Sequence, residues 1–363
     1  MKLSTRVASL VAAAGLAACA AACTTSSAAT PAPTQGSAVP ATSTPTAASS
    51  PFTASTDPSS VSSSSAAPSS AATSSSASSA PSSSSVGPSS TPVGQATSQP
   101  GVPTSKVLTI VVENHTLAQM QQGMPYLNSL ALQYGYATDY HAIRHPSLPN
   151  YLAIAFGTTA GVKDDHGPDV HHVDGESVFS QANTYSPAGA RVYAESMTTN
   201  CQLTNAYPYA VRHNPWTYGS AGCSTGSVPA GTPSSGRLSS DVADGTLPCA
   251  GMLIPDLVHD AHDASLAKAD GYLESWLPTL MGGSDFRSGK LAIVVTADED
   301  DKSSDNRVLT VVLSRSVSHK VVTTPLTHYS LSRLYSSVCG DRHYLGEAAT
   351  APSLRTAFGL VGP

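Results

Sequence analysis

Short apolar runs, separated by polar and glycine-rich stretches, mark the chain after residue 105. The two clearest runs are VLTIVV at 107–112 and LAIVVT at 291–296. Runs of this length, rich in β-branched residues, are typical of strands buried on both faces of a parallel sheet. Shorter patterns predict three more strands, at 137–140, 190–194 and 308–313.

Helical spacing of apolar residues lies between these runs. It is clearest at 265–280, where seven side chains recur on one helix face: Leu266, Ala269, Tyr272, Leu273, Trp276, Leu277 and Leu280. Further helices are expected at 124–134, 150–155 (with Pro149 at the first helical position), 177–182, 326–338 and 352–358. The Gly-, Ser-, Pro- and Thr-rich segment 197–248 is expected to form a loop or lid. Strands that alternate with helices predict an α/β fold, a doubly wound and mainly parallel sheet with helices on both faces.

The beginning of the chain has a different composition. Residues 1–23 carry Lys2 and Arg6, then an apolar stretch too short to span a bilayer, which is the pattern of an export signal. LAAC at 16–19 resembles a lipobox, at which bacterial lipoproteins are cleaved and acylated on the cysteine, here Cys19; Cys23 is a poorer second candidate. The alternative is an ordinary cleaved secretion signal. Both interpretations predict an extracellular protein, either lipid-anchored at the cell surface or secreted.

Residues 24–105 are almost wholly Ser, Thr, Ala and Pro, with one charged residue, Asp57, and one aromatic residue, Phe52. Such a segment buries too little apolar surface to offset the conformational entropy of folding, so we expect a disordered linker. A flexible coil of this length reaches on the order of 50 Å. The linker would hold the domain at 106–363 away from a membrane or wall.

Charge and cysteine content narrow the partners of that domain. The net charge of −6 argues against nucleic acid, and no basic helix suggests direct membrane docking, so a membrane would be reached only through the lipid anchor. Four cysteines in an exported domain predict two disulfides, for which spacing allows three pairings. We expect Cys201–Cys223 and Cys249–Cys339. A zinc site is the weaker alternative because the domain contains no C-x-x-C pair.

Acidic residues close the two clearest strands. Glu113-Asn114 follows the first run and Asp298-Glu299 follows the second. Ligands of open α/β sheets bind beyond the carboxyl ends of the strands. Two such ends would bring hard oxygen ligands to one point, which suits a divalent cation. The alternative is that these carboxylates are solvated turn residues.

The segment HPSLPNY at 145–151 places Ser147 at, or one residue before, the N-cap of a helix. Prolines hold the residues that precede them, His145 and Leu148, out of helical geometry. Ser147 either caps the helix or acts as a nucleophile. In the second case the helix N-terminus would stabilise a bound anion, and a nearby cation would depress the pKa of the hydroxyl.

The histidines leave alternatives open. His213 lies in a predicted loop, where it is either a merely exposed residue or a functional one. His115 and His145 flank the acidic and serine motifs, and we expect them to support the residues of those motifs. His259 and His262, beside Asp260 and Asp263, would either place two imidazoles on one metal or cap the following helix. A further group, His166, Asp169, His171 and His172, is interpreted as a surface loop with a small capacity for adventitious metal binding.

Six segments together resemble, in order, the motifs of the phosphoesterase family of acid phosphatases and phospholipases C, part of the alkaline-phosphatase-like superfamily. They are VVENHT (111–116), HPSLPNYLAIAFG (145–157), VRHNPW (211–216), DLVHDAHDASLAKADGYL (256–273), TADEDD (296–301) and LTHYSLSRL (326–334). The resemblance is greatest to secreted acid phosphatases with HPSLPNY, including those classed as phosphatidylinositol-3-phosphatases.

The resemblance implies a role for each matched residue. The implied metal ligands are Glu113, Asn114, Asp298 and Glu299, and the implied nucleophile is Ser147, with Asn150 closing its motif. His213 and His262 would contact the phosphoryl group, Asp260 would orient a histidine, and His328 would lie at the substrate. One departure is Asp300-Asp301-Lys302, where many phospholipases C have a Gly-rich continuation; these extra acids are interpreted as solvated turn residues.

The function that follows is a metal-dependent acid phosphatase that hydrolyses phosphate monoesters through a phosphoserine. Its partners would be small phosphate esters or phosphoinositides, and its cofactor Mg²⁺, Ca²⁺, Mn²⁺ or Zn²⁺. Histidines acting as acids would favour mildly acidic pH. The alternatives are a phospholipase C that cleaves phosphodiesters and a non-catalytic surface lipoprotein.

Overall fold

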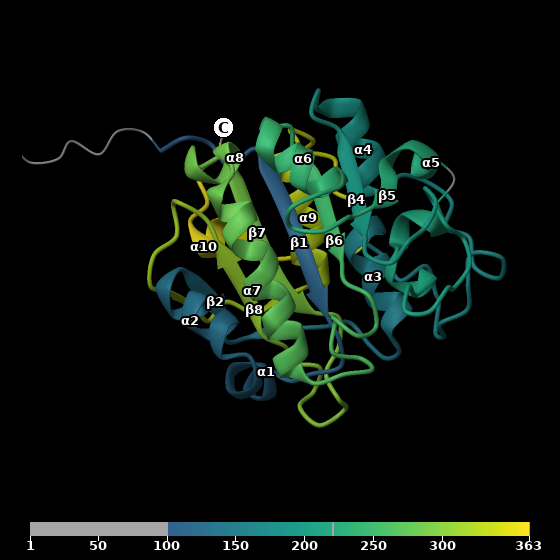
Figure 1. The fold of residues 1–363 in the computed structure, drawn as a ribbon, viewed down its shortest axis with the longest axis horizontal. Helices are drawn as coiled ribbons and strands as arrows, with labels where there is room; N and C mark the ends of the chain where they lie inside the picture. Colours follow the sequence, from purple (N-terminus) through teal and green to yellow (C-terminus); the bar gives the residue numbers. More distant parts are fainter. Residues whose placement is uncertain (1–100, 220, 363) are drawn as a thin grey trace, which may run out of the picture. The chain divides into compact units, whose positions relative to one another are not determined.

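The computed structural model describes residues 101–219 and 221–362 (Figure 1). The predicted export signal and nearly all of the predicted linker lie outside these residues and stay predictions. Thr104, at the end of the predicted linker, is buried, and its N–H donates to the Val361 carbonyl at 3.0 Å. The packed chain therefore begins slightly before residue 106. Within the described ranges, no helix is both long and apolar enough to cross a bilayer.

An eight-stranded sheet forms the centre of the domain, in the order β5-β4-β6-β1-β7-β8-β2-β9. All neighbouring pairs are parallel except β7–β8 and β2–β8. The strands are β1 Lys106–Val112, β2 Gly135–Ala137, β4 Ala190–Ala194, β5 Ser227–Pro229, β6 Ala250–Ile254, β7 Leu291–Ala297, β8 Thr310–Leu313 and β9 Lys320–Val322. A small parallel pair joins β3 Tyr140–His141 to β10 Leu326–Thr327.

Helices cover both faces of this sheet, as predicted, and α7 crosses in front of it while α9 lies behind (Figure 1). On the side of α7 (Leu266–Gly282) it contacts α1 (Leu117–Gly123), α2 (Pro125–Gln133), α6 (Arg237–Asp244) and α8 (Ser284–Arg287). On the other side α9 (His328–Val338) contacts α3 (Ser147–Phe156), α4 (Val178–Tyr185) and α10 (Leu354–Phe358). The remaining short elements are α5 Cys223–Gly226, η1 Val211–His213, η2 Pro215–Tyr218 and η3 Gly346–Ala349.

The mainly parallel α/β fold is confirmed, and so are most of the long elements. The predicted apolar face of α7 is buried except for Leu266, which is half-buried. The strand expected at 137–140 is wrong, because the chain turns there between β2 and β3. The loop expected at 197–248 contains β5 and α6, and β6 was not predicted at all.

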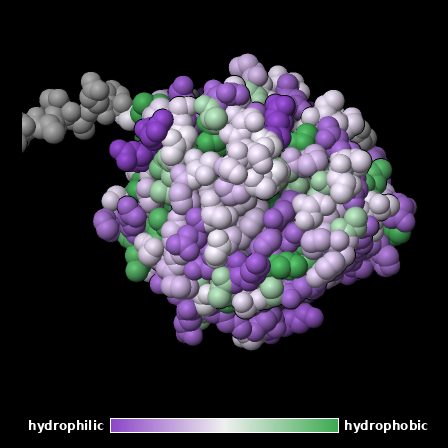
Figure 2. All heavy atoms as spheres, in the orientation of Figure 1, coloured by the Kyte–Doolittle hydropathy of each residue, from purple (hydrophilic) through white to green (hydrophobic). Residues whose placement is uncertain are grey.

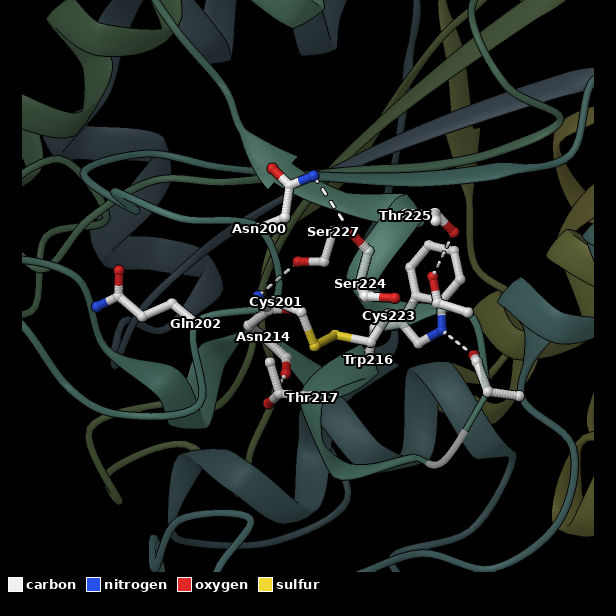
Figure 3. Close-up of a disulfide and its surroundings, with 12 residues drawn as sticks. Asn200, Cys201, Gln202, Asn214, Trp216, Thr217, Cys223, Ser224, Thr225 and Ser227 are labelled. Carbon is white, nitrogen blue, oxygen red and sulfur yellow. Dashed lines mark hydrogen bonds between the residues drawn. A yellow bond between two sulfur atoms is a disulfide. The ribbon is translucent and has the colours of Figure 1, made fainter.

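Both expected disulfides are present. Cys249 is bonded to Cys339, and Cys201 to Cys223. Figure 3 shows the second bond beside Trp216, with Asn214 donating from Nδ2 to Ser227 Oγ at 2.8 Å. The Cys201 N–H also donates to the Ser227 carbonyl, at 3.0 Å. The Cys201–Cys223 bond therefore ties the loop after β4 to α5, the short helix that leads into β5.

The surface is polar on the face drawn in Figure 2. Hydrophobic residues on that face are scattered among hydrophilic and neutral ones and do not gather into one patch. Apolar side chains are packed instead between the sheet and the two helical layers. That arrangement makes the strands a rigid frame for whatever lies at their carboxyl ends.

Candidate active site

The two predicted acidic pairs lie together at the carboxyl ends of β1 and β7. These strands pair in parallel with Val112 opposite Ala297, so Glu113 and Asp298 leave the sheet side by side. The Asn114 N–H donates to Asp298 Oδ1 at 3.3 Å. Glu113 and Asp298 are fully buried and Glu299 nearly so, which excludes the alternative that they are solvated turn residues.

Ser147 is brought to the same place by α3, which begins at Ser147 itself. The N-cap is Pro146, so the expectation that Ser147 lies at or before the N-cap is wrong by at least one residue. Pro149 is therefore the third helical residue, not the first, and Leu148 is helical. The first N–H groups of a helix need no partner inside it, so a proline there removes no bond. Ser147 is buried, and its hydroxyl is near enough to Asp298 to oppose in part the rise that burial causes in the pKa of that carboxyl.

Asn150 ties α3 to the acidic residues. Its Oδ1 accepts the N–H of Ile143 at 2.9 Å and of Arg144 at 3.2 Å, and its Nδ2 donates to Glu299 Oε2 at 3.2 Å. His145, as predicted, supports the same residues, since Nδ1 lies 3.1 Å from Glu299 and Nε2 3.2 Å from Asp300. The turn that leads into α3 is thus fixed against the end of β7.

The loop after β6 contributes a third group. The Glu113 N–H donates to the Asp260 carbonyl at 2.8 Å, and His213 lies between the two carboxylates. Its Nε2 contacts Glu113 Oε1, and its Nδ1 lies 3.3 Å from Asp260 Oδ2. The ring stacks on Tyr151 at 5.0 Å. Burial opposes protonation of His213, but Glu113 and Asp260 outweigh it and raise its pKa to about 9.

His262 and His259 point to different places. His262 Nε2 lies 3.7 Å from Glu113 Oε2, its Nδ1 lies 2.6 Å from Asp263 Oδ1, and its side chain is 34% exposed. His259 Nδ1 instead lies 3.1 Å from Glu195. The geometry gives no support to two imidazoles on one metal, and it leaves His262 as the open histidine of the site.

His328 is buried behind the site. Its Nε2 lies 2.7 Å from the Asp298 carbonyl oxygen and its Nδ1 lies 3.1 Å from the Tyr140 hydroxyl. Burial lowers the pKa of His328 to about 4, so it is neutral at physiological pH. The imidazole therefore holds the end of β7 through its backbone.

The acidic residues have the properties expected of cation ligands. Glu113 Oε1 contacts His213, but Glu113 Oε2 and Asp298 Oδ2 are buried with no hydrogen-bond partner in the described ranges. Burial, followed by repulsion from Glu113 and Glu299, raises the pKa of Asp298 well above its ordinary value. Burial, followed by repulsion from Glu113 and Asp165, raises the pKa of Glu299 to about 8.

A cation would relieve both the burial and the repulsion, so the residues fit a divalent metal ion. Ligand atoms of Glu113, His213 and Asp260 also lie within 4.8 Å of one another. His213 and Asp260 are therefore additional candidates for ligands beside the four residues expected. The sequence offered no reason to add them, because they come from separate loops.

Two residues at the site were not singled out from the sequence. Arg212 is largely buried, its Nε has no hydrogen-bond partner among the described residues, and its charge helps to lower the pKa of Glu113. Asp165 accepts the Leu148 N–H at 2.9 Å at the start of α3 and lies 4.0 Å from Arg212. The only sequence signal was the position of Arg212 next to His213.

The remaining acidic and histidine groups have other roles. Asp300 is buried and accepts the N–H groups of Lys302, Ser304 and Asn306 at 2.7, 2.6 and 3.2 Å. It therefore organises a turn, and the expectation that Asp300 is solvated is wrong. His166 and His171 lie 2.7 and 2.5 Å from Asp164. His166 is exposed, which agrees with the predicted surface loop.

A mainly parallel α/β sheet whose strand ends carry buried carboxylates beside a helix-start serine defines a hydrolase-type site. The model of the phosphoesterase family matches residues 105–334. This match covers more than half of the chain, and the chain belongs to that family. It is a phosphoric ester hydrolase, so the alternative of a non-catalytic surface lipoprotein is rejected.

Individual proteins that are similar to this chain are phosphatases. The chain is 29% identical over 265 residues to a phosphatidylinositol-3-phosphatase of Mycobacterium tuberculosis, covering 71% of this chain and 84% of that protein. An acid phosphatase of Aspergillus fumigatus is 27% identical over 217 residues, 53% of this chain and 46% of that protein, so this chain spans about half of its length. A solved alkaline phosphatase superfamily protein from Vibrio parahaemolyticus covers 71% of this chain and 72% of its own at 10% identity, with a TM-score of 0.44, too weak to support an argument.

Proposed function

We propose that this domain is a metal-dependent phosphomonoesterase that works through a phosphoserine at Ser147. The observation that carries the proposal is the position of Ser147 near Asp298, in a group of buried carboxylates in which Glu113 Oε2 and Asp298 Oδ2 lack partners among the described residues. A serine that only capped a helix would need no such surroundings. Glu113, Asn114, Asp298 and Glu299 are the proposed ligands, with His213 and Asp260 in reach of Glu113.

When bound, the cation would lower the pKa of the Ser147 hydroxyl and neutralise charge on the phosphate. The Ser147 hydroxyl loses its proton to solvent, Ser147 Oγ then bonds to phosphorus, and the bond from phosphorus to the leaving oxygen breaks. His262, half-exposed beside Glu113, is placed to protonate the leaving alcohol. The oxygen of a water molecule then bonds to phosphorus, the bond from phosphorus to Ser147 Oγ breaks and releases the Ser147 alkoxide, and His262 accepts a proton from that water.

His213 has a different proposed part. Both of its ring nitrogens face carboxylates, and the ring is buried against Tyr151. We assign it to orienting Glu113, with Asp260 orienting His213 in turn. Arg212 is the proposed contact for a phosphate oxygen, since its guanidinium is largely buried at the site and its Nε lacks a partner.

The surroundings of the site favour a monoester over a phospholipid diester. A hollow of about 220 Å³ is lined by polar side chains, His145, Asp300, Lys302, Asp305 and Asn306, of which His145 also lies 3.1 Å from Glu299. A phospholipase C needs an apolar surface for diacylglycerol. The name of the M. tuberculosis relative makes a phosphoinositide headgroup the first substrate to try.

The test is hydrolysis of p-nitrophenyl phosphate, phosphatidylinositol 3-phosphate and a choline phosphodiester, before and after chelation. We expect turnover of the monoesters that chelation abolishes and a divalent cation restores. Ser147→Ala should lower turnover by roughly 10³-fold or more. Ser177→Ala is the matched control, because Ser177 is 4% exposed at the start of α4 as Ser147 is 3% exposed at the start of α3. Near-normal turnover by Ser147→Ala would refute the assignment.

We also propose that the domain works outside the cell, attached through Cys19 or secreted. The two disulfides support export, since such bonds persist in oxidising compartments. Incorporation of a fatty-acid analogue that is lost in Cys19→Ser would support the anchor. Incorporation that persists in Cys19→Ser and is lost in Cys23→Ser would move it to the second cysteine.

A further inference from the structure

A second group of carboxylates and histidine lies at the carboxyl ends of β4 and β6. Glu195 follows β4 and Asp256 follows β6, and the two strands pair in parallel with Ala194 opposite Ile254. The Glu195 N–H donates to the Ile254 carbonyl at 2.9 Å. The strands thus deliver two acids to one point, as β1 and β7 do at the catalytic site.

His259 completes this group. Its Nδ1 lies 3.1 Å from Glu195 Oε1 and Oε2 and 3.3 Å from Asp256 Oδ1. One ligand atom from each of the three residues lies within 4.8 Å of the others. Asp256 also accepts from the Ser196 hydroxyl at 2.7 Å, which fixes the carboxylate in place.

Tyr272 supplies an independent sign of a missing partner. Its side chain packs from α7 against the group, and its ring stacks on His259 at 5.0 Å. The residue is 7% exposed, yet its hydroxyl has no hydrogen-bond partner in the described part of the chain. Burial, followed by the charges of Glu195 and Asp256, raises the pKa of Tyr272 well above its ordinary value, and Tyr272 lines the same cavity as Glu195 and His259.

The group is reachable from outside. A cavity of about 460 Å³ is lined by Glu195, His259 and Tyr272 on one side and by residues that include Lys268 and Trp276 on the other. Asp256 is buried beneath them. An ion that entered through this cavity would meet two carboxylates, one imidazole nitrogen and a phenolic oxygen.

We propose that Glu195, Asp256 and His259 form a second divalent-cation site, separate from the catalytic one, with Tyr272 at its edge. A mixed set of oxygen and imidazole ligands suits Zn²⁺ or Mn²⁺. The rival arrangement is a protonated His259 that bridges the two acids without an ion.

Such a site would act on catalysis through the backbone. Asp256 accepts the Asp260 N–H on its carbonyl at 2.8 Å, and the same short loop carries Asp260 and His262 to the catalytic carboxylates. An ion on Asp256 would hold this loop in its working position. The expected effect is on stability and on the placing of His262, not on the bond-breaking step itself.

The experiment counts ions on the whole protein. Protein stripped with a chelator is titrated with Zn²⁺ or Mn²⁺, and bound metal is measured by calorimetry and by elemental analysis after gel filtration. Wild type should hold one ion more than His259→Ala and one more than Glu195→Gln. Ser147→Ala should keep the wild-type count. His343→Ala, at an exposed histidine outside these groups, is the histidine control and should also keep it.

A spectroscopic measurement guards against variants that fold poorly. Co²⁺ bound to wild type should show visible absorption from an imidazole-ligated ion at this site, and both Glu195→Gln and His259→Ala should remove that absorption. The decisive quantity is the difference of one ion between wild type and His259→Ala, whatever the catalytic site holds. Equal counts and equal spectra in wild type and a folded His259→Ala would overturn the site and leave the ion-free bridge.

Discussion

Asp241 and Asp298 are buried to nearly the same degree, with 3% and 0% of their surface exposed, but opposite charges surround them. Asp241 Oδ2 accepts three hydrogen bonds, from Arg191 Nη1 at 2.8 Å, from Arg237 Nε at 3.0 Å and from the Tyr193 hydroxyl at 2.7 Å. Burial raises the pKa of Asp241, but these donors outweigh it and lower that pKa.

Asp298 has almost the reverse environment. Only its Oδ1 accepts backbone N–H groups, from Asn114 at 3.3 Å and Glu299 at 2.7 Å, while Oδ2 has no partner in the described ranges. Its charged neighbours include the carboxylates Glu113 and Glu299, and its pKa is raised. Because a buried charge must be balanced, the contrast is that Asp241 is balanced by the protein itself, whereas the described residues leave Asp298 unbalanced, as the proposed cation ligand would be.

The largest expected effect tests this contrast directly. Asp298→Asn keeps the shape of the side chain but removes its charge, so it should lose the catalytic cation and lower kcat/KM by roughly 10³-fold or more. Measurements are metal content and hydrolysis of a phosphate monoester. Asp241→Asn is the control and should keep activity per folded molecule. Full activity and metal content in Asp298→Asn would remove the basis of the comparison.

Arg212 tests whether the site also needs a fixed positive charge. Arg212→Ala should lower kcat/KM by about 10²-fold, because a donor aimed at a phosphate oxygen would be lost. Arg212→Lys should recover part of this loss, since lysine keeps the charge but not the planar fork. Arg237→Ala, which changes a guanidinium at Asp241, serves as the control. An Arg212→Ala enzyme with wild-type kinetics would show that the guanidinium does not contact substrate.

The frame of the fold was readable because its strands are continuous apolar runs. The carboxyl ends of β1 and β7 could be located from those runs alone, and so could the closeness of Glu113 to Asp298 just beyond them. β6 escaped prediction because AGMLI is only five residues long and includes Gly251. It becomes a strand through pairing with β1 and β4 on both sides, a long-range effect that no local pattern reports.

The site was predictable where chemistry lies at a strand end or helix start, and not where loops bring it in. Ser147 could be placed from its prolines, although the helix begins two residues earlier than Pro149. The contact of Asp165 with α3 and the burial of Arg212 depend on how separate loops pack. The turn after β6 likewise decides that His259 points to Glu195 while His262 points to Glu113.

Asp241 itself gives the next prediction, one of stability. Asp241→Asn leaves two guanidinium groups without their carboxylate, and the free energy of unfolding at neutral pH should fall by about 1–3 kcal/mol. A lowered folded-state pKa makes the contribution present above the ordinary value of 3.8 and lost as pH falls through the folded value. The gap between wild type and variant should therefore shrink in acid, as denaturant titrations at several pH values would show. A gap that grew in acid would mean that the donors do not hold the carboxylate in its charged form.

Glu299 should behave with the opposite sign, in metal-free protein. Its pKa is raised from 4.5 to about 8, so its contribution is greatest below the ordinary value and is lost as pH rises toward the folded one. Chelated wild type should lose stability relative to Glu299→Gln between those values, by about 2–4 °C in unfolding temperature. Added divalent cation should stabilise wild type more than the variant, and most at the alkaline end, because binding releases the proton. Parallel curves for the two metal-free proteins would mean that Glu299 is already balanced by the protein, as Asp241 is, and that no ion is needed there.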